Sequence, residues 1–426
     1  MRHWIRRLCW LGCALLAAGN GLMAQTRSPL TWDQVLRRFE ENNPMLQAGE
    51  LSVNESRAEE ITADLRPNPI LSLSTDGTQL APYEQVWQPL RGTMGVAMLS
   101  YLHERHHQRE LRLESAQDGT AITVSDEADL KRTLLFNLRS AFVVALEAKA
   151  VLQLAEDNLA YWDRVLSISR TRFQAGDIAQ IDLDRLELHR VQFVSDLQTA
   201  KVNLRTAKIE LLMLLNDRTP VDQFDVTGPY NFNNELPPLD EFRKIALISR
   251  PDLKAAMQGI EQARTDHRLA IANGAADPTF STWYSYNPSF NNPHDRYTIA
   301  GGVSIPLRIY DRNQGEKLRT RLAIERRQRL REVVQAQVFS DVDSAYAMVQ
   351  GDLTLLRAYK AKYLQQAVNV RETLRFSYEH GGASLLDFLN AEDDYRAVEL
   401  SYLNLIGSYL TAAAQLNLAV GREVLQ

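Results

Sequence analysis

Three histidines in a short segment are the first residues whose types and spacing could do chemistry. His103, His106 and His107 form a His-x-x-His-His cluster, and imidazole is the commonest metal ligand. A typical site would add a cysteine or a further ligand at regular spacing, and neither lies nearby. We therefore predict solvated side chains at the junction of a strand and a helix, and no metal ligands.

An acidic run and two glycine pairs are the other candidates for chemistry. Residues 392–394, Glu-Asp-Asp, could form an acid–base or metal cluster. Consecutive residues of a helix point around its surface, so we interpret them as a solvated or pore-facing acidic patch. The glycine pairs at 301–302 and 381–382 are not phosphate-binding loops, because no Lys-Ser/Thr pair follows. No nucleophile, base and orienting group occur together, so we predict neither an enzyme nor a cofactor.

The first two dozen residues have the pattern of a secretory signal peptide. Three arginines precede a short apolar run over residues 8–18, and Ala24 offers a small-residue cleavage point. The run is too short to span a bilayer, although an uncleaved anchor is the alternative. Both cysteines, Cys9 and Cys13, fall inside the predicted signal peptide 1–24. The mature chain is then free of cysteine, which excludes disulfides and thiolate chemistry.

The charge balance argues against nucleic acid as a partner. The formal net charge is −5 at pH 7, and acids and bases interleave without a basic stripe. The mean hydropathy of −0.30 argues against a bundle of membrane helices. Residues 400–421 carry no charge, yet they include the polar residues Asn404, Ser408, Thr411, Gln415 and Asn417. Such a segment favours a packed helix over a membrane span, which remains the alternative.

An internal repeat is the strongest feature of the chain, and repeats decide the architecture where they occur. Landmarks of the first half recur 205 to 209 residues later. The corresponding pairs are Asn43-Pro44 with Arg250-Pro251, Pro69 with Pro278, Gly95-Val96 with Gly302-Val303, and Phe173 with Tyr378. This duplication predicts two repeats of the same organisation, over residues 25–225 and 226–426.

Within each half the periodicity predicts a helix, two strands and a long helical hairpin. Residues 30–66 have helical spacing until Pro67 and Pro69 end it. Leucines or tyrosines then alternate with small polar residues, which is the pattern of a membrane strand between lipid and lumen. The tyrosines and Trp283 suit a membrane interface. The predicted strands cover residues 71–74, 93–99, 280–286 and 299–305, with a polar loop at 287–295.

Apolar residues recur three and four apart over long stretches without proline. The stretch from about residue 107 to 173 predicts a helix of roughly 100 Å, at 1.5 Å per residue. Sustained spacing of this kind predicts coiled-coil-like packing, and the many alanines imply closely approaching helices. The first stripe is Leu134, Leu138, Ala141, Ala145, Ala148, Leu152, Ala155, Leu159, Trp162, Leu166, Ser169 and Phe173. Returning stripes cover 197–214 and 388–419.

Four strands cannot close a barrel by themselves. An unclosed edge leaves backbone groups unpaired, which lipid does not tolerate. The barrel is therefore expected to be shared between chains. Two chains would supply eight strands and three would supply twelve, and strand geometry alone leaves both open.

The order of these elements occurs twice after the predicted signal peptide. In this respect the chain resembles the TolC family of outer-membrane efflux proteins. The matching segments are LTWDQVLRRFEENNPML, LRPNPILSLS, GVSIPLRIYDRNQG, RFQAGDIAQIDL and SYEHGGASLLDFLNAEDDY. The Pro-Asn-Pro segment resembles the heavy-metal-efflux branch. The resemblance implies a mainly α fold with a membrane β-barrel contribution, in which duplicated strand pairs and long helical hairpins build a trimeric α-barrel/β-barrel channel.

The resemblance also implies location and partners. The homotrimer would sit in the outer-membrane lipid of a Gram-negative-type cell, with its helices projecting into the periplasm. A mixed α/β belt would use 217–245 and the chain ends. The channel would be a passive conduit for cargo delivered by an inner-membrane pump and a periplasmic adaptor. The alternative is a periplasmic coiled-coil scaffold or adaptor protein without a barrel.

A periplasmic gate is implied at the two glycine turns, Gly176 and Gly381, which would dock the adaptor. Asp182, Tyr378 and Asp387 match the gate positions of the family. There, links between a tyrosine and an aspartate join neighbouring turns, and aspartate rings narrow the pore.

This sequence departs from the family at two gate positions. Ala383 stands where the family has a gate arginine, and Asn390 stands where it has a second ring aspartate. Alanine supplies no charge, and asparagine supplies a dipole in place of a charge. Both departures bear on how strongly this gate closes and how negative it is.

Overall fold

The fold is described from a computed structural model over residues 28–82, 84–288, 294 and 296–425. The predicted signal peptide and most of the loop at 287–295 lie outside these described residues. The chain forms two compact units: Met1–Asn42 with Val144–Tyr230, and Asn43–Val143 with Asn231–Gln426. The second unit joins segments from both halves of the chain, so the bounds of the units do not correspond to the predicted repeats. The duplication over 25–225 and 226–426 therefore stays a prediction.

The first unit contains the short helix α1 (Trp32–Asn42), the later part of α3 (Gln108–Ala175) and α4 (Gln180–Leu214). A short 3-10 turn, η1 (Val221–Gln223), follows, and an isolated parallel bridge joins Leu30 to Val226. The predicted stripe is confirmed as the inner face of α3, because its residues are buried or half-buried. With 68 residues, α3 is about 100 Å long at 1.5 Å per residue.

One predicted helix is in fact two. The pattern over residues 30–66 divides into α1 and α2 (Pro44–Asp64). Asn43 ends the first helix and caps the second, since its side chain accepts hydrogen bonds from the backbone nitrogens of Met45 at 2.9 Å and Leu46 at 3.2 Å. Pro44 occupies the first turn, where no backbone donor is required.

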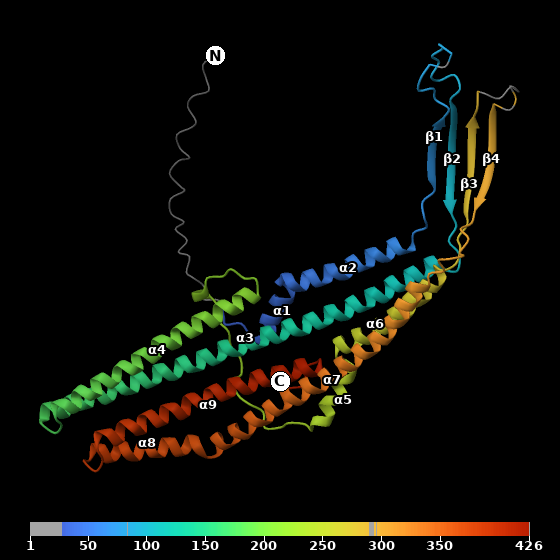
Figure 1. The fold of residues 1–426 in the computed structure, drawn as a ribbon. Helices are drawn as coiled ribbons and strands as arrows, with labels where there is room; N and C mark the ends of the chain where they lie inside the picture. Colours follow the sequence, from blue (N-terminus) through green and yellow to red (C-terminus); the bar gives the residue numbers. More distant parts are fainter. Residues whose placement is uncertain (1–27, 83, 289–293, 295, 426) are drawn as a thin grey trace, which may run out of the picture. The chain divides into compact units, whose positions relative to one another are not determined.

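The second unit contains one antiparallel sheet, in the order β1-β2-β3-β4 (Figure 1). The strands are β1 (Ile70–Asp76), β2 (Met94–Leu102), β3 (Thr279–Tyr286) and β4 (Tyr297–Ser304). All four predicted strands are confirmed, with boundaries shifted by a few residues. Within the described residues, β1 and β4 each pair with one neighbour and so form the edges.

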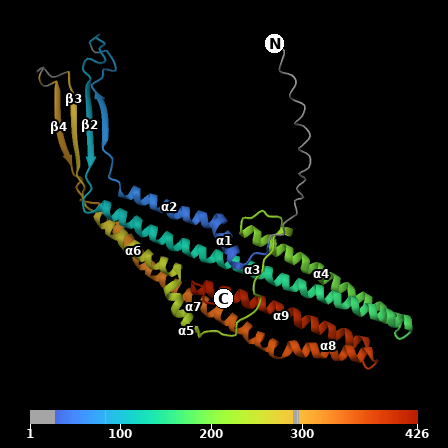
Figure 2. The same ribbon diagram turned by 180° about the vertical axis from the view of Figure 1, so that it is seen from behind.

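The helices of the second unit pack in pairs. Helix α5 (Leu239–Ser249) and α6 (Pro251–Ala272) pack on α7 (Gln314–Ala358), and α7 packs on α9 (Leu385–Val420). A π turn, η3 (Tyr359–Tyr363), joins α7 to α8 (Leu364–Glu379), which runs beside α9 (Figure 2). Within the described part of the chain, no helix is long and apolar enough to cross a membrane. The uncharged stretch at 400–421 is largely buried as part of α9.

The C-terminal end of α9 is held by hydrogen bonds to its last carbonyl groups. Arg132 donates to the Leu418 carbonyl, and Arg250 donates to the Ala419 carbonyl at 3.2 Å. Ser249 Oγ donates to the Val420 carbonyl at 2.6 Å. Cations at this end also complement the helix dipole. These hydrogen bonds satisfy carbonyl groups that the last turn of the helix leaves without partners.

Candidate functional site

The register of the sheet separates a face of leucine, isoleucine and tyrosine side chains from a face that carries the serines of the strands. Leu71 pairs with Leu99, Tyr101 with Phe280, and Tyr284 with Ile299, and paired residues lie on one face. That face holds Leu71, Leu73, Gly95, Ala97, Leu99, Tyr101, Phe280, Thr282, Tyr284, Tyr286, Tyr297, Ile299, Gly301 and Val303. The opposite face carries the serines Ser72, Ser74, Ser100, Ser281, Ser285 and Ser304, together with the apolar residues Ile70, Val96, Met98, Leu102 and Trp283.

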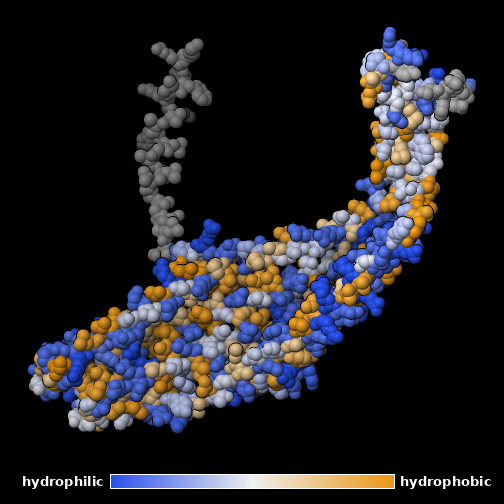
Figure 3. Space-filling view, in the orientation of Figure 1, coloured by the Kyte–Doolittle hydropathy of each residue, from blue (hydrophilic) through white to orange (hydrophobic). Residues whose placement is uncertain are grey.

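The apolar face is exposed in the single chain. Leu73 is 75% exposed and Ile299 is 79% exposed, and apolar side chains reach the surface along the strands (Figure 3). A contiguous exposed surface of leucine, tyrosine and isoleucine side chains usually marks a site that contacts a protein partner or lipid. The two faces together can separate an apolar phase from an aqueous one.

Trp283 lies on the serine face and not with the tyrosines, which differs from the role predicted for it at the membrane interface. In the register it alternates with Tyr284, and its ring lies against Gly302. A Cβ atom at position 302 would approach the Trp283 ring to 3.2 Å. The missing side chain of Gly302 therefore makes room for the indole.

The first helical turn joins α3 to α4 in the first unit. Gly176 has φ +82°, a conformation that side chains rarely adopt, and its N–H donates to the Phe173 carbonyl at 3.0 Å. Asp182 lies in the first turn of α4, where a carboxylate is stabilised by the helix dipole. The structure thus confirms the predicted turn, while the gate role of Asp182 stays a prediction.

A buried aromatic cluster packs α3 against α4. Trp162 is fully buried and stacks on Phe193, with ring centroids 4.9 Å apart. Its indole N–H donates to the Leu186 carbonyl at 3.1 Å. Ion pairs between the two helices, such as Arg190 with Asp163 at 2.6 Å, flank the seam. The cluster fixes the spacing of the two helices beside the turn.

The second turn joins α8 to α9 in the second unit. Gly381 has φ +75°, and the Gly382 N–H donates to the Ser377 carbonyl at 2.7 Å. Ser384 and Asp387 form a capping box: the Ser384 N–H and Oγ donate to Asp387 Oδ2 at 3.1 and 2.7 Å, while the Asp387 N–H donates to Ser384 Oγ at 3.2 Å. These bonds satisfy donors at the start of the helix.

The capping box also affects the charge of Asp387. Its hydrogen bonds from the Ser384 hydroxyl and then from the Ser384 backbone lower the pKa of the carboxyl below its usual value. Asp387 is exposed, and Asn390 is exposed one turn later on the same side of α9. The carboxylate is therefore ionised throughout the physiological range and faces outward from its own helix pair.

Tyr378 contacts the same turn from α8. Its ring stacks on the buried Phe388, with centroids 5.2 Å apart and planes 5° apart. The stack positions Tyr378 at the end of the hairpin, beside the helix that carries Asp387. Asp182 belongs to the other compact unit, so the predicted link between Tyr378 and Asp182 stays a prediction.

The acidic run at 392–394 is divided between the interior and the surface. Glu392 is 2% exposed, so the expectation of a solvated acidic patch is wrong for this residue. It follows Ala391 on the side of α9 that packs inward, whereas Asp393 and Asp394 are exposed. Among the described residues, no group of three or more His, Cys, Asp or Glu side chains could hold a metal ion.

Two features at the site were not predicted, namely the π turn η3 and a groove of about 570 Å³ between α8 and α9. No glycine or proline interrupts the segment from Tyr359 to Tyr363. Without such a residue, the sequence holds no signal for a change of helix type. The groove depends on how the side chains of η3 and α8 pack against those of the following helix, α9.

The chain is similar in sequence to efflux proteins. A family model described as outer membrane efflux protein matches residues 243–422. The cobalt-zinc-cadmium resistance protein CzcC of Cupriavidus metallidurans is 22% identical, over 93% of this chain and 91% of that protein. The outer membrane efflux protein BepC of Brucella suis is 20% identical, over 99% of this chain and 92% of that protein.

The fold matches solved channel structures over most of its length. The crystal structure of CusC has a TM-score of 0.77 at 19% identity, covering 92% of both chains. The outer membrane protein VceC from Vibrio cholerae has a TM-score of 0.74 at 15% identity, covering 92% of this chain and 96% of that one. The predicted fold class, mainly helical with a small strand contribution, is confirmed.

Proposed function

The chain belongs to the outer membrane efflux protein family, and we propose that it is the channel subunit of a tripartite efflux or secretion system. The family is one of channel proteins. The sheet with one apolar and one serine-bearing face is the observation that supports a channel most directly. In an outer membrane, the apolar face contacts lipid and the serine face lines water.

The channel is a homotrimer in this proposal. A single chain offers four strands with two edges, and an open edge is not stable in lipid. Three copies supply twelve strands, with β4 of one protomer beside β1 of the next. The duplicated strand pairs and hairpins of the predicted repeats give each protomer two equivalent contributions to the wall.

The helical hairpins form the periplasmic duct, and their two turns form its gate. Gly176 and Gly381 mark these turns, where an adaptor docks. Tyr378 and Asp182 link neighbouring turns, and Asp387 contributes a ring of three carboxylates. The stacking of Tyr378 on Phe388 supports this assignment, because it holds the tyrosine at the end of its hairpin.

The system is completed by a periplasmic adaptor and an inner-membrane pump, and this chain acts as a passive conduit. The named relatives include a cobalt-zinc-cadmium resistance protein and a pyoverdine export outer membrane protein. These names span metal ions and an organic molecule, so the relatives do not point to one cargo. Selection then belongs to the pump and adaptor.

The test is native mass in detergent together with single-channel recording in a planar bilayer. We expect three protomers per particle and discrete conductance steps. A stable monomer with intact strands would contradict the channel. The alternative, a periplasmic scaffold without a barrel, predicts a protein that stays soluble once its signal peptide is removed and that shows no conductance.

The gate is tested by Tyr378→Phe. The change removes one hydroxyl and keeps the ring, so the stack on Phe388 is preserved. A hydrogen bond to a charged group contributes roughly 1.5–3 kcal/mol, and a trimer repeats it three times. We expect higher conductance and greater sensitivity of cells to large antibiotics. Tyr363→Phe on the same hairpin is the control, and equal conductance in all three proteins would place the gate elsewhere.

A further inference from the structure

The π turn η3 divides two helices that otherwise form one continuous segment. Helices α7 and α8 follow each other without a proline, whereas the long helix α3 runs through 68 residues without interruption. A π turn inserts one extra residue into the helical ladder, and such turns are frequent at functional sites. Two residues of this turn, Tyr359 and Tyr363, line the groove between α8 and α9.

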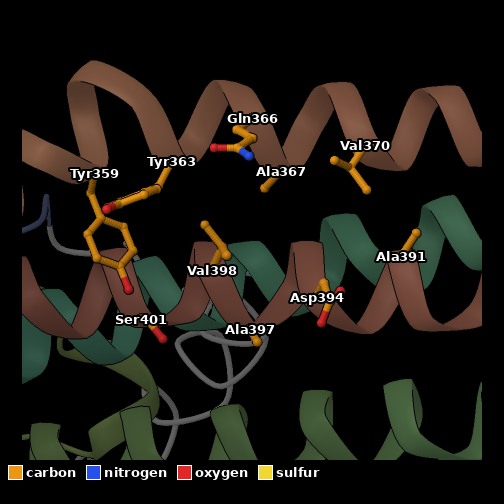
Figure 4. Close-up of a pocket in the computed structure, with 10 residues that line it drawn as sticks. All are labelled: Tyr359, Tyr363, Gln366, Ala367, Val370, Ala391, Asp394, Ala397, Val398 and Ser401. Atoms are coloured by element: carbon orange, nitrogen blue, oxygen red, sulfur yellow. The ribbon is translucent and has the colours of Figure 1, made fainter.

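The groove begins at this turn and lies between α8 and α9 (Figure 4). Ring contacts join the two helices on either side of it: Tyr359 stacks near Tyr402 at 6.3 Å, and the Arg371 guanidinium lies 3.8 Å from the centroid of the Tyr395 ring. Between these contacts the lining side chains are small. Ala367 and its neighbours leave a space of about 570 Å³.

The groove contains a carboxylate with no ion pair of its own. Asp394 is exposed, and it makes no hydrogen bond or ion pair within the described part of the chain. The preceding residue differs in this respect, since Asp393 pairs with Arg396 at 3.1 Å. Gln366 and Ser401 add an amide and a hydroxyl to the lining. Figure 4 shows Asp394 on the α9 side of the groove.

Aromatic and apolar side chains form the rest of the lining. Tyr359 and Tyr363 contribute two rings at one end, and Val370 and Val398 contribute methyl groups. The Tyr363 ring already has a cation near it, because Lys362 Nζ lies 5.7 Å from its centroid. Rings of this kind attract cations through their quadrupole.

We propose that this groove binds a small organic cation with an apolar body. The Asp394 carboxylate attracts positive charge, and the tyrosine rings add to that attraction. The alanine side chains of the lining, Ala367, Ala391 and Ala397, leave room for a flat apolar group. The volume lies within the range of small-molecule sites, about 300–1,000 Å³. A metal ion does not suit the groove, because no group of three or more His, Cys, Asp or Glu side chains that could hold one occurs among the described residues.

The experiment titrates ethidium, a planar aromatic cation, into the purified full-length protein in detergent and follows its fluorescence. We expect saturable binding with one ethidium per protomer. Asp394→Asn should weaken binding about tenfold or more, which is the order expected for the loss of a charged partner. Asp393→Asn is the matched control and should bind like the native protein.

A second variant tests the groove apart from its charge. Ala367→Leu places a larger side chain in the groove without changing its charge. It should abolish saturable ethidium binding, whereas Asp393→Asn should retain it. The neutral dye N-phenyl-1-naphthylamine should bind the native protein and Asp394→Asn alike. Because these measurements need no conductance, a non-conducting protein would leave their outcome unaffected.

Three outcomes would overturn the proposal. They are non-saturable ethidium binding to the native protein, equal affinity of the native protein and Asp394→Asn, and equal weakening by Asp393→Asn. The last outcome would mean a diffuse attraction to surface charge. Unchanged native mass and thermal midpoint of each variant would exclude misfolding as the cause of lost binding.

Discussion

Asp387 combines two tasks at the α8–α9 turn. Its carboxylate accepts hydrogen bonds from Ser384 and so caps α9, and in the proposed trimer three such carboxylates form a ring. Carboxylate rings at a constriction favour cations. The neighbouring Asn390 supplies a dipole only, so the ring carries one charge per protomer at this level. The selectivity is expected to be modest.

Asp387→Asn should reduce cation selectivity, measured as the reversal potential under a salt gradient. Ser384→Ala is the control, because it weakens the cap and keeps the charge. The pKa of Asp387 is lowered, chiefly by the Ser384 hydroxyl, so selectivity should persist below the ordinary aspartate value of about 3.9. It should fade as the pH drops through the lowered value. If Asp387→Asn leaves selectivity unchanged, Asp387 does not line the pore.

Asp225 is the second residue with a defined charge environment, in the first unit. Lys149 Nζ lies 2.6 Å from Asp225 Oδ2, and Lys208 Nζ lies 3.1 Å from Oδ1. Burial opposes ionisation of this carboxyl, but the hydrogen bonds from both lysines outweigh burial and lower its pKa. The two ion pairs anchor the segment after η1 to α3 and α4.

Asp225→Asn should lower the free energy of unfolding by about 1–3 kcal/mol at neutral pH, as expected for charged hydrogen bonds. A lowered pKa stabilises the fold above the unfolded value of about 3.9, and this contribution disappears as the pH falls through the folded value. The native and variant stabilities should therefore converge in acid. Asp222→Asn removes an exposed pair with Arg205 and should change stability by less than about 1 kcal/mol.

At the scale of elements, the two long hairpins are held together differently. The α3–α4 seam has a packed aromatic cluster with Trp162 at its centre. Helix α8 has no fully buried residue among those described, and between its ring contacts with α9 the two helices leave a groove. The first hairpin is therefore expected to be the more rigid of the two, because buried apolar contacts set local stability.

Trp162→Ala tests the rigidity of the α3–α4 hairpin. Truncating a fully buried tryptophan should cost about 3–5 kcal/mol, and hydrogen exchange should accelerate along α3 and α4 around the substitution. Ile168→Ala is the control on the same helix, since that side chain is 55% exposed. Equal exchange rates in both variants would mean that the cluster does not stabilise the hairpin.

At the scale of the whole molecule, the edges of the sheet decide the assembly. Cysteines at Ser74 of β1 and Thr298 of β4 would lie on the serine face of the two edge strands. The predicted mature chain has no other cysteine, so a short bismaleimide reagent should join protomers into dimers and trimers on a denaturing gel.

The control places cysteines at Ser100 and Ser281, which pair within one protomer. This variant should give an internal link and migrate as a monomer. A monomer band for the Ser74 and Thr298 variant under the same conditions would contradict closure of the barrel between copies. It would mean that β1 of one protomer does not lie beside β4 of the next.

Local patterns determined much of this protein. The strands follow from alternation of apolar and serine residues, and the length of α3 follows from its stripe, because both periods are properties of the backbone geometry. The glycine turns follow from the need for positive φ at Gly176 and Gly381. The division at Asn43-Pro44 was also readable, since asparagine caps and proline starts a helix.

Only the tertiary structure decided which side chains meet. Glu392 is buried although Asp393 and Asp394, which follow it, are exposed, and the Trp283 ring lies against Gly302 of β4. The groove with Asp394 likewise depends on how α8 packs against α9, which follows it in the chain. A periodic pattern states which face of a helix or strand is apolar. Packing between distant segments determines what that face contacts, and no local signal carries that information.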